Sequence, residues 1–181
     1  MKGKQVGVGV TGGIAAYKAA DLVSKLAQAG AVVTVIMTRN AQEFVRPLTF
    51  EALSGQPVVT ELFGPQERRE PRHVALAEKL DLLVIAPATA DFIGKASAGI
   101  ADDALLTTLI SVACPVVICP AMNSRMYTNQ IVQANLSRLK AHGYVIVEPE
   151  EGWLSCGSVG VGRLASVERI VQTVARLLGS A

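Results

Sequence analysis

Apolar runs alternate with amphipathic segments along most of the chain. Short apolar runs rich in β-branched residues predict buried strands at residues 5–10, 31–36, 81–86, 116–119 and 144–147. Apolar residues at helical spacing predict helices at 15–29, at 128–141 and from Val167 to Leu177. The first strand, helix and strand form a βαβ unit, which favours a parallel sheet with a right-handed crossover.

Shorter segments complete the pattern. Helical pieces are expected at 40–45, at 47–55, after the turn at 87–91 to about Ser97, and at 102–112, with an edge strand at 58–60 and an exposed loop at 63–72 that leads to His73. Periodicity disappears between Pro149 and Arg163, where four glycines surround Trp153 and Cys156; this is more typical of a binding flap than of an idle connection. The pattern predicts an α/β fold: one doubly wound (Rossmann-like, flavodoxin-like) domain over residues 1–181, with a parallel sheet flanked by helices and a flap at about 149–163.

Composition narrows the classes of function. Half of the residues are apolar and only 18% are charged, so much of the chain must be hidden in a core or against other subunits, which suggests an oligomer. The net charge of +2, with scattered basic residues, does not favour a nucleic-acid partner. No apolar run approaches the ~20 residues that would span a membrane, and no signal-peptide pattern is present. We therefore expect a soluble, cytoplasmic protein with no membrane partner.

The three cysteines show no pairing pattern. Cys114, Cys119 and Cys156 contain no CxxC motif, which argues against a disulfide framework and against a metal site. Cys114 and Cys119 lie in or beside an apolar strand and are predicted core residues. Cys156 instead lies in the glycine-rich segment.

Two turns at predicted strand ends are candidate ligand sites. The Gly12–Gly13 pair is not a dinucleotide fingerprint, because the third glycine and the acid that closes the second strand are missing, and Thr38 stands in place of that acid. Such a turn can bring backbone N–H groups and a hydroxyl to a phosphate, which fits a mononucleotide, or it can simply be a tight turn. Asn123 follows the fourth strand, where ligands bind in open α/β sheets, although an Asn there can equally cap the next helix.

Five motifs together resemble one family. In chain order they are Thr11–Ile14, His73–Leu76, Ala86–Ala90, Pro120–Met126 and Ser155–Arg163. Over nearly the whole chain they resemble the homo-oligomeric flavin-containing cysteine decarboxylases, which include phosphopantothenoylcysteine decarboxylase, plant salt-tolerance flavoproteins and lantibiotic peptidyl-cysteine decarboxylases. The Pro-Ala-Met-Asn and Cys-Gly motifs are specific to this family, whereas the glycine pair and the Pro-Ala-Thr turn are shared with relatives of other function.

The resemblance implies a chemistry for a cysteine carboxylate. A saturated carbon cannot accept the electrons that CO₂ leaves behind, so FMN first oxidises the thiol end to a thioaldehyde, and decarboxylation then gives an enethiol. His73 would be the base, with an ordinary pKa near ~6.5 that suits proton transfer at neutral pH. Asn123 would hold the carboxylate, and Cys156 would be the acid when hydride returns from the reduced flavin.

The resemblance also implies the residues around each ligand. FMN contacts are expected at Gly12, Gly13, Ile14, Thr38, Thr89, Ala90, Asp91 and Ala121. Substrate contacts are expected at Asn123, Met126, Ser155, Gly157 and Arg163. The flavin is expected at a subunit boundary in a homotrimer, which can build up to a dodecamer.

The substrate is left open by the sequence. Retention of Cys156 favours conversion of 4'-phosphopantothenoylcysteine to 4'-phosphopantetheine in coenzyme A biosynthesis. Ser155, Ser158 and Val161 replace the alanine, aspartate and proline expected in a housekeeping enzyme, so the alternative is a peptidyl-cysteine decarboxylase that gives an aminoenethiol at the C-terminus of a ribosomal peptide. A flavin prenyltransferase would lack the Pro-Ala-Met-Asn loop, and a non-catalytic flavoprotein that regulates a phosphatase would carry a long acidic tail. The chain could also be the front part of a bifunctional protein with a cysteine ligase.

Overall fold

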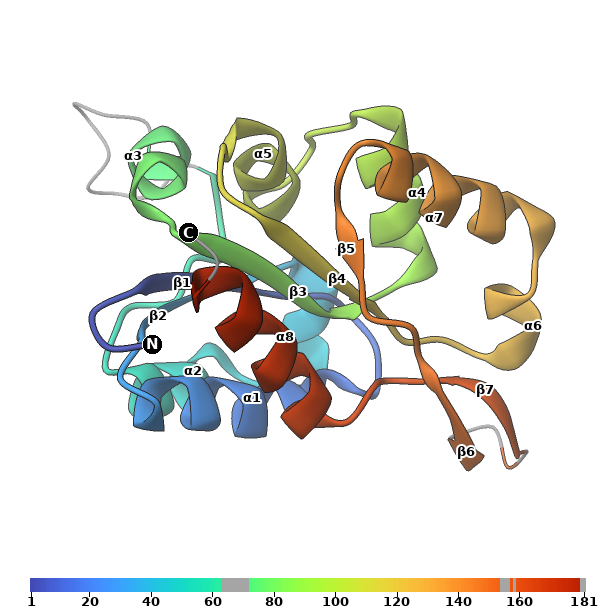
Figure 1. Cartoon of the computed structure of the whole chain (residues 1–181), viewed down its shortest axis with the longest axis horizontal. Helices are drawn as coiled ribbons and strands as arrows, with labels where there is room; N and C mark the ends of the chain where they lie inside the picture. The colour runs from blue at the N-terminus through green and yellow to red at the C-terminus, as the bar shows by residue number, and fades with distance from the viewer. Residues whose placement is uncertain (63–71, 154–156, 158, 180–181) are drawn as a thin grey trace.

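A parallel sheet forms the centre of the molecule (Figure 1). The computed structural model describes residues 1–62, 72–153, 157 and 159–179. Within them, five parallel strands make the sheet: β1 (Gln5–Val10), β2 (Val32–Met37), β3 (Leu82–Ala88), β4 (Val116–Pro120) and β5 (Val145–Ile146). Their order is β2-β1-β3-β4-β5, so the chain changes direction across the sheet between β1 and β3, which is where an open α/β sheet binds its ligands.

Helices cover both faces of the sheet (Figure 1). One face packs against α1 (Ala16–Gln28), α2 (Pro47–Ser54) and α8 (Val167–Gly179). The other face packs against α3 (Arg72–Lys79), α4 (Ala90–Ala98), α5 (Ala104–Ser111) and α7 (Gln130–Ala141). The 3₁₀ helix η1 (Arg39–Glu43) follows β2, and α6 (Ser124–Tyr127) follows β4. The predicted doubly wound α/β fold is confirmed.

Strand β1 shows how sequence sets the two layers. Val6, Val8 and Val10 are fully buried in the core beneath α1, as expected for alternate positions of a strand. The intervening Gly9 faces the other layer, where an added Cβ would lie 2.6 Å from Cδ1 of Leu105. The absence of a side chain at this position therefore lets α5 pack closely on the sheet.

The C-terminal flap differs from the prediction. Residues 149–163 were expected to lack regular structure, but β6 (Glu150–Trp153) and β7 (Val159–Arg163) pair as an antiparallel hairpin. The prediction was wrong for these two arms because glycine-rich strands carry little alternation of apolar and polar side chains. The periodicity of apolar residues along the sequence therefore does not reveal this pairing.

Smaller elements also depart from the prediction. The edge strand expected at 58–60 is only a bridge between Val59 and Ile36, and β5 has two residues instead of four. Helices α3 and α6 are too short to produce a clear periodic signal. His73, expected directly after the loop at 63–72, lies in the first turn of α3.

The cysteines of the described region are core residues, as predicted. Cys119 is fully buried, and burial raises the pKa of its thiol. Cys114 is partly buried against the second core, where burial also raises the thiol pKa. In the described ranges, no helix combines the length and the apolar character needed to cross a membrane.

Candidate active site

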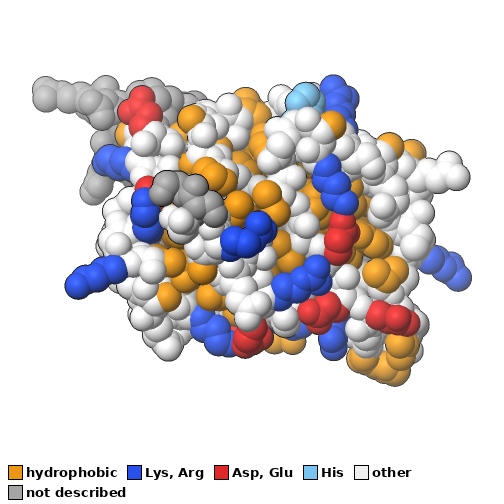
Figure 2. All heavy atoms as spheres, viewed as in Figure 1, with side chains coloured by type: hydrophobic (Ala, Val, Ile, Leu, Met, Phe, Trp, Pro, Cys, Tyr) orange, Lys and Arg blue, Asp and Glu red, His pale blue; other side chains and the backbone are white. Residues whose placement is uncertain are grey.

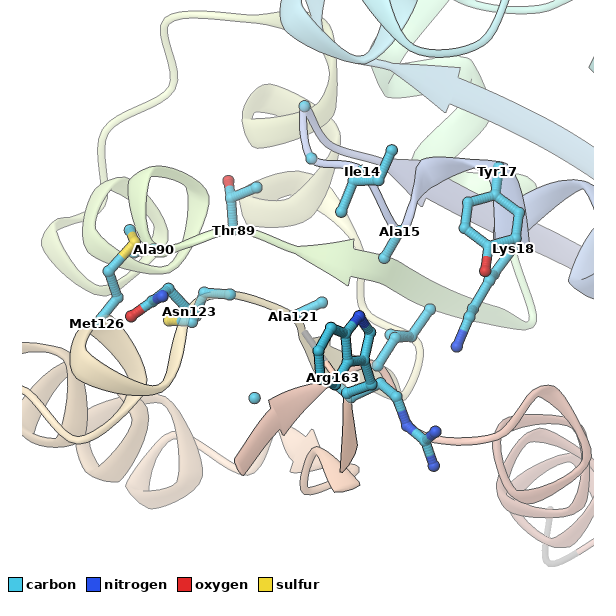
Figure 3. Close-up of a pocket in the computed structure, with 16 residues that line it drawn as sticks. Ile14, Ala15, Tyr17, Lys18, Thr89, Ala90, Ala121, Asn123, Met126 and Arg163 are labelled. Atoms are coloured by element: carbon cyan, nitrogen blue, oxygen red, sulfur yellow. The ribbon is translucent and has the colours of Figure 1, made fainter. Parts of the chain in front are cut away.

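A cavity of about 540 Å³, here called the first cavity, opens at the carboxyl end of the sheet (Figure 3). Four segments line it: the β1–α1 turn, the β3–α4 turn, the loop after β4, and the hairpin β6–β7. Its lining includes Gly12, Gly13, Ile14, Ala15, Tyr17, Lys18, Thr89, Ala90, Ala121, Met122, Asn123, Met126, Trp153, Gly162, Arg163 and Leu164. The cavity therefore lies at the topological switch point of the sheet.

A second cavity, of about 460 Å³, adjoins the first. The two share Gly12, Thr89, Ala90 and Met126 in their linings. The second also takes in Thr38 and Arg39 after β2, Asp91 and Lys95 from α4, and Asp102 and Asp103 just before α5. A ligand could thus extend from one cavity into the other past the β1–α1 turn.

The buried Thr11 joins the two turns between the cavities. Its Oγ1 donates to the Pro87 carbonyl at 2.8 Å and accepts from the Thr89 N–H at 3.0 Å. Thr89 in turn caps α4, because its Oγ1 accepts from the Phe92 N–H. The hydroxyl thus reinforces the backbone pairing of β1 with β3 and the Thr11 N–H to Pro87 carbonyl hydrogen bond, which hold the ends of these two strands together.

The two glycines of the β1–α1 turn serve different purposes. A Cβ at Gly12 would lie 2.3 Å from Cβ of Asn40, so only glycine permits the η1 segment to approach this closely. A Cβ at Gly13 would meet only Cγ2 of Thr89, at 3.5 Å, and would instead take up space at the cavity wall. Helix α1 begins after Ala15, which provides no side-chain cap. Its amino end is therefore suited to an anion or another acceptor from a ligand.

Charged side chains in the second cavity largely neutralise one another. Lys95 pairs with Asp91 at 3.4 Å and with Asp102 at 3.1 Å. Asp103 caps α5 by accepting from the Leu106 N–H at 2.7 Å, and burial raises the pKa of its carboxyl. The Lys95–Asp102 pair thus links the last turn of α4 to the segment just before α5 at the cavity wall.

Asn123 lines the first cavity and also caps a helix. Its Oδ1 accepts from the Arg125 N–H at 2.8 Å at the start of α6. The Ser124 hydroxyl donates to the Val161 carbonyl at 2.7 Å, which ties this loop to β7. The capping and ligand-binding interpretations of Asn123 are therefore compatible, since one amide can be oriented by the cap and still face the cavity.

A polar network anchors the far end of α6. The Tyr127 hydroxyl and the Lys140 ammonium both donate to the Glu148 carboxylate, just before β6. Burial and the neighbouring Glu148 carboxylate raise the pKa of Tyr127 to about 12. Burial alone would raise the pKa of Glu148, but the hydrogen bonds from Lys140 and Tyr127 hold it below its ordinary value. The network fixes the root of the hairpin relative to the Asn123 loop.

The structure brings most of the predicted site residues together. Gly12, Gly13, Ile14, Thr89, Ala90, Ala121, Asn123, Met126 and Arg163 line the first cavity, and Thr38 and Asp91 line the second. Gly157 is exposed at the hairpin end and lines neither cavity. His73 is described only as part of the α3 backbone, and Ser155 and Cys156 lie outside the described residues.

Sequence reasoning missed Tyr17, Lys18 and Trp153 in the cavity lining. Lys18 lies in the first turn of α1, four residues after Ile14, so the predicted helix already placed it close to a residue assigned to the flavin. That spacing was the available signal. Trp153 could not be found in this way because its position depends on the hairpin.

Comparisons with known proteins agree with this architecture. A family model described as Flavoprotein matches residues 1–179. The chain is 53% identical over 163 residues to the coenzyme A biosynthesis bifunctional protein CoaBC of Bacillus subtilis (strain 168), covering 90% of this chain and 40% of that protein. It is 46% identical over 175 residues to CoaBC of Mycobacterium bovis, covering 97% of this chain and 41% of the relative. The chain thus spans about two fifths of the length of these relatives.

Solved structures match over nearly the full length. The FMN-dependent cysteine decarboxylase SpaF superposes with a TM-score of 0.85 at 34% identity, covering 98% of this chain and 96% of SpaF. A PPC decarboxylase mutant complexed with pantothenoylaminoethenethiol superposes with a TM-score of 0.87 at 25% identity, covering 99% of this chain and all of the other.

Proposed function

The chain belongs to the Flavoprotein family, and from that premise we propose that it is an FMN-dependent cysteine decarboxylase that converts 4'-phosphopantothenoylcysteine to 4'-phosphopantetheine in coenzyme A biosynthesis. The observation that carries the proposal is that Asn123 lines the same cavity as the Gly12–Gly13 and Thr89–Ala90 turns. A cysteine carboxylate at Asn123 would therefore lie beside a cofactor held at those turns. The 53% identity to a coenzyme A biosynthesis protein supports this choice of substrate.

The residues around the two cavities fit FMN. The space beside Gly13 is open, α1 begins without a side-chain cap, and the hydroxyls of Thr38 and Thr89 line the walls. Such turns offer backbone donors to a phosphate and ribityl chain. We assign the cofactor to Gly12, Gly13, Ile14, Thr38, Thr89, Ala90, Asp91 and Ala121. When bound, FMN supplies the two-electron acceptor that the thiol oxidation requires.

The chain's own residues hold the substrate and move protons. The neutral amide of Asn123 would orient the carboxylate without stabilising its charge so strongly that loss of CO₂ is opposed. His73 would remove a proton from the cysteine end, and Cys156 would return one to the enethiol carbon during the final reduction; both roles are carried over from the resemblance. Met126 and Arg163 line the cavity around the rest of the substrate.

An apolar rim supports the proposal of a homo-oligomer. Trp153 and Val159 face each other across the hairpin and are 68% and 67% exposed. Figure 2 shows apolar side chains gathered at the hairpin end, at the lower right. Ile14, Tyr17 and Met126 are also exposed beside the first cavity. A second copy of the chain would cover this rim and close the site, as in a trimer or a dodecamer.

Measurement of CO₂ release by the flavin-loaded protein tests the proposal. Release from 4'-phosphopantothenoylcysteine is expected, and release from short peptides that end in cysteine should be much slower. His73→Asn should retain flavin and release no CO₂, and Cys156→Ser should accumulate the enethiol. Turnover of the peptides alone would establish the peptidyl-cysteine alternative, and a protein that cannot take up FMN would disprove the scheme.

A further inference from the structure

Lys18 lies at the end of the first cavity that is remote from Asn123. Figure 3 shows Asn123 and Met126 at one end of the cavity and Tyr17, Lys18 and Arg163 at the other. Lys18 and Arg163 also line an adjoining groove of about 340 Å³ between α1, α8 and the hairpin. An elongated ligand that is held at Asn123 would therefore reach two cations at its opposite end.

The acids of this groove are already engaged with other cations. Asp21 and Glu168 both pair with Lys25, each at 2.7 Å. Glu150 pairs with Arg163 at 3.1 Å and accepts from the Ser166 N–H at 2.8 Å. These pairs leave no carboxylate in the groove for Lys18.

Lys18 therefore differs from the other charged side chains of this groove. Its side chain is partly buried, yet within residues 1–62, 72–153 and 159–179 it has no ion-pair partner. A partly desolvated ammonium without a counter-ion favours an anionic ligand. The neighbouring Arg163, held in place by Glu150, adds guanidinium donors to the same wall.

We infer that Lys18, together with Arg163, binds the phosphate of the substrate and so selects a phosphorylated small molecule over a peptide C-terminus. This inference rests on the function proposed above, in which the substrate carries a cysteine carboxylate at one end and a phosphomonoester at the other. A phosphomonoester bears a charge of about −1.5 to −2 at pH 7, which is the ligand that an ammonium and a guanidinium bind best. A peptide supplies no such dianion at this distance from its terminal cysteine.

The test compares 4'-phosphopantothenoylcysteine with pantothenoylcysteine, which lacks the phosphate, on the FMN-loaded protein. The native chain should prefer the phosphorylated compound. Lys18→Met should lower kcat/KM for that compound by roughly 10- to 100-fold, mainly through KM, because the phosphate is bound equally in the ground and transition states. Its kcat/KM for pantothenoylcysteine should fall much less, so the preference for the phosphorylated compound should shrink. Lys18→Arg should restore most of the preference, and Lys2→Met, which removes an exposed ammonium outside these cavities, should behave as the native chain.

Several results would overturn the inference. Equal losses for the two compounds, or an unchanged preference, would mean that Lys18 does not bind the phosphate. Loss of flavin from Lys18→Met would assign the cation to the cofactor instead. In both cases the native chain still decarboxylates its substrate, so the proposed function stands. If the native chain releases CO₂ from neither compound, the proposed function fails and the inference falls with it.

Discussion

The Met122 N–H donates to the Gly162 carbonyl at 2.9 Å, which joins the loop after β4 directly to strand β7. Gly162 has a φ of +131°, and a Cβ there would lie 2.2 Å from the carbonyl oxygen of Met122. The Ser124–Val161 hydrogen bond lies beside this contact. The hairpin and the Asn123 loop therefore approach so closely that glycine is required between them.

Gly162→Ala should separate these two segments. Because the backbone conformation and the Met122 carbonyl both exclude a Cβ, we expect the free energy of unfolding to fall by about 1–3 kcal/mol and CO₂ release to fall at least about tenfold. Thermal denaturation and the decarboxylation assay measure the two effects. Gly94→Ala in α4 is the control, since its Cβ would lie 3.8 Å from Nδ2 of Asn135 and should be tolerated. Native behaviour of Gly162→Ala would contradict this account of the contact.

Asn123→Asp should distinguish capping from carboxylate binding. Aspartate caps a helix as well as asparagine does, so the free energy of unfolding should change by less than about 0.5 kcal/mol. The added charge should repel the substrate carboxylate and lower kcat/KM by about 100-fold or more. Asn129→Asp is a matched control, because Asn129 caps α7 with the same geometry, accepting from the Ile131 N–H at 2.9 Å, and lies outside the cavities. Full activity of Asn123→Asp would remove Asn123 from its proposed role.

Alanine at the two adjacent glycines of the β1–α1 turn should have different effects. Gly12→Ala forces apart the turn and the η1 segment, so the apoprotein itself should lose about 1–3 kcal/mol of stability. Gly13→Ala should leave the apoprotein as stable as the native chain but weaken flavin binding, because its Cβ enters the cavity wall. Thermal denaturation without flavin, followed by titration with FMN, separates the two outcomes. Native flavin affinity in Gly13→Ala would show that the cofactor does not contact this position.

Glu148→Gln should reveal a pH-dependent contribution to stability. The folded pKa of Glu148 lies below its ordinary value, so its carboxylate stabilises the fold above about pH 4.3 and loses this effect as the pH falls through the folded pKa. Because the side chain is 42% exposed, we expect at most about 1 kcal/mol at pH 7. The difference in Tm between the native chain and Glu148→Gln should shrink as the pH is lowered from 7 to 3. Glu78→Gln, at an exposed position on α3, is the control. If the Tm difference between the native chain and Glu148→Gln stayed constant from pH 7 to pH 3, the carboxylate of Glu148 would not make this contribution.

The sequence predicted the parts of the fold that have a strong period or a long apolar run. Strand β1 was predicted to the residue, and α1 to within one residue at each end, because buried valines and the Leu22–Leu26 stripe leave little ambiguity. The hairpin was missed because its glycine-rich strands show little alternation of apolar and polar side chains, and its contacts with Met122 and Ser124 join residues far apart in sequence. Short α3 and α6 were missed because a single turn or two gives no reliable period.

The candidate site was predicted by motif more than by pattern. Asn123 and Thr38 each cap a helix and each line a cavity. For Asn123, its place after a strand was compatible with either role, and only the family motif favoured ligand binding. Lys18 was missed for a different reason. Its importance depends on which acids are already paired with Lys25 and Arg163, and that information exists only in three dimensions.

The single hydroxyl of Thr11 has a consequence for how the site assembles. It forms hydrogen bonds with backbone groups of both Pro87 and Thr89, so it helps to set the spacing of the β1–α1 and β3–α4 turns without any bound ligand. A cofactor that enters between these turns meets donors already at their final separation and needs little reorganisation to bind. The Asn123 loop and the hairpin, in contrast, depend on each other for their positions. Under the proposed function, recognition is divided: the preset β1–α1 and β3–α4 turns would bind the cofactor, and the paired loop and hairpin, together with Lys18 on α1, would bind the substrate.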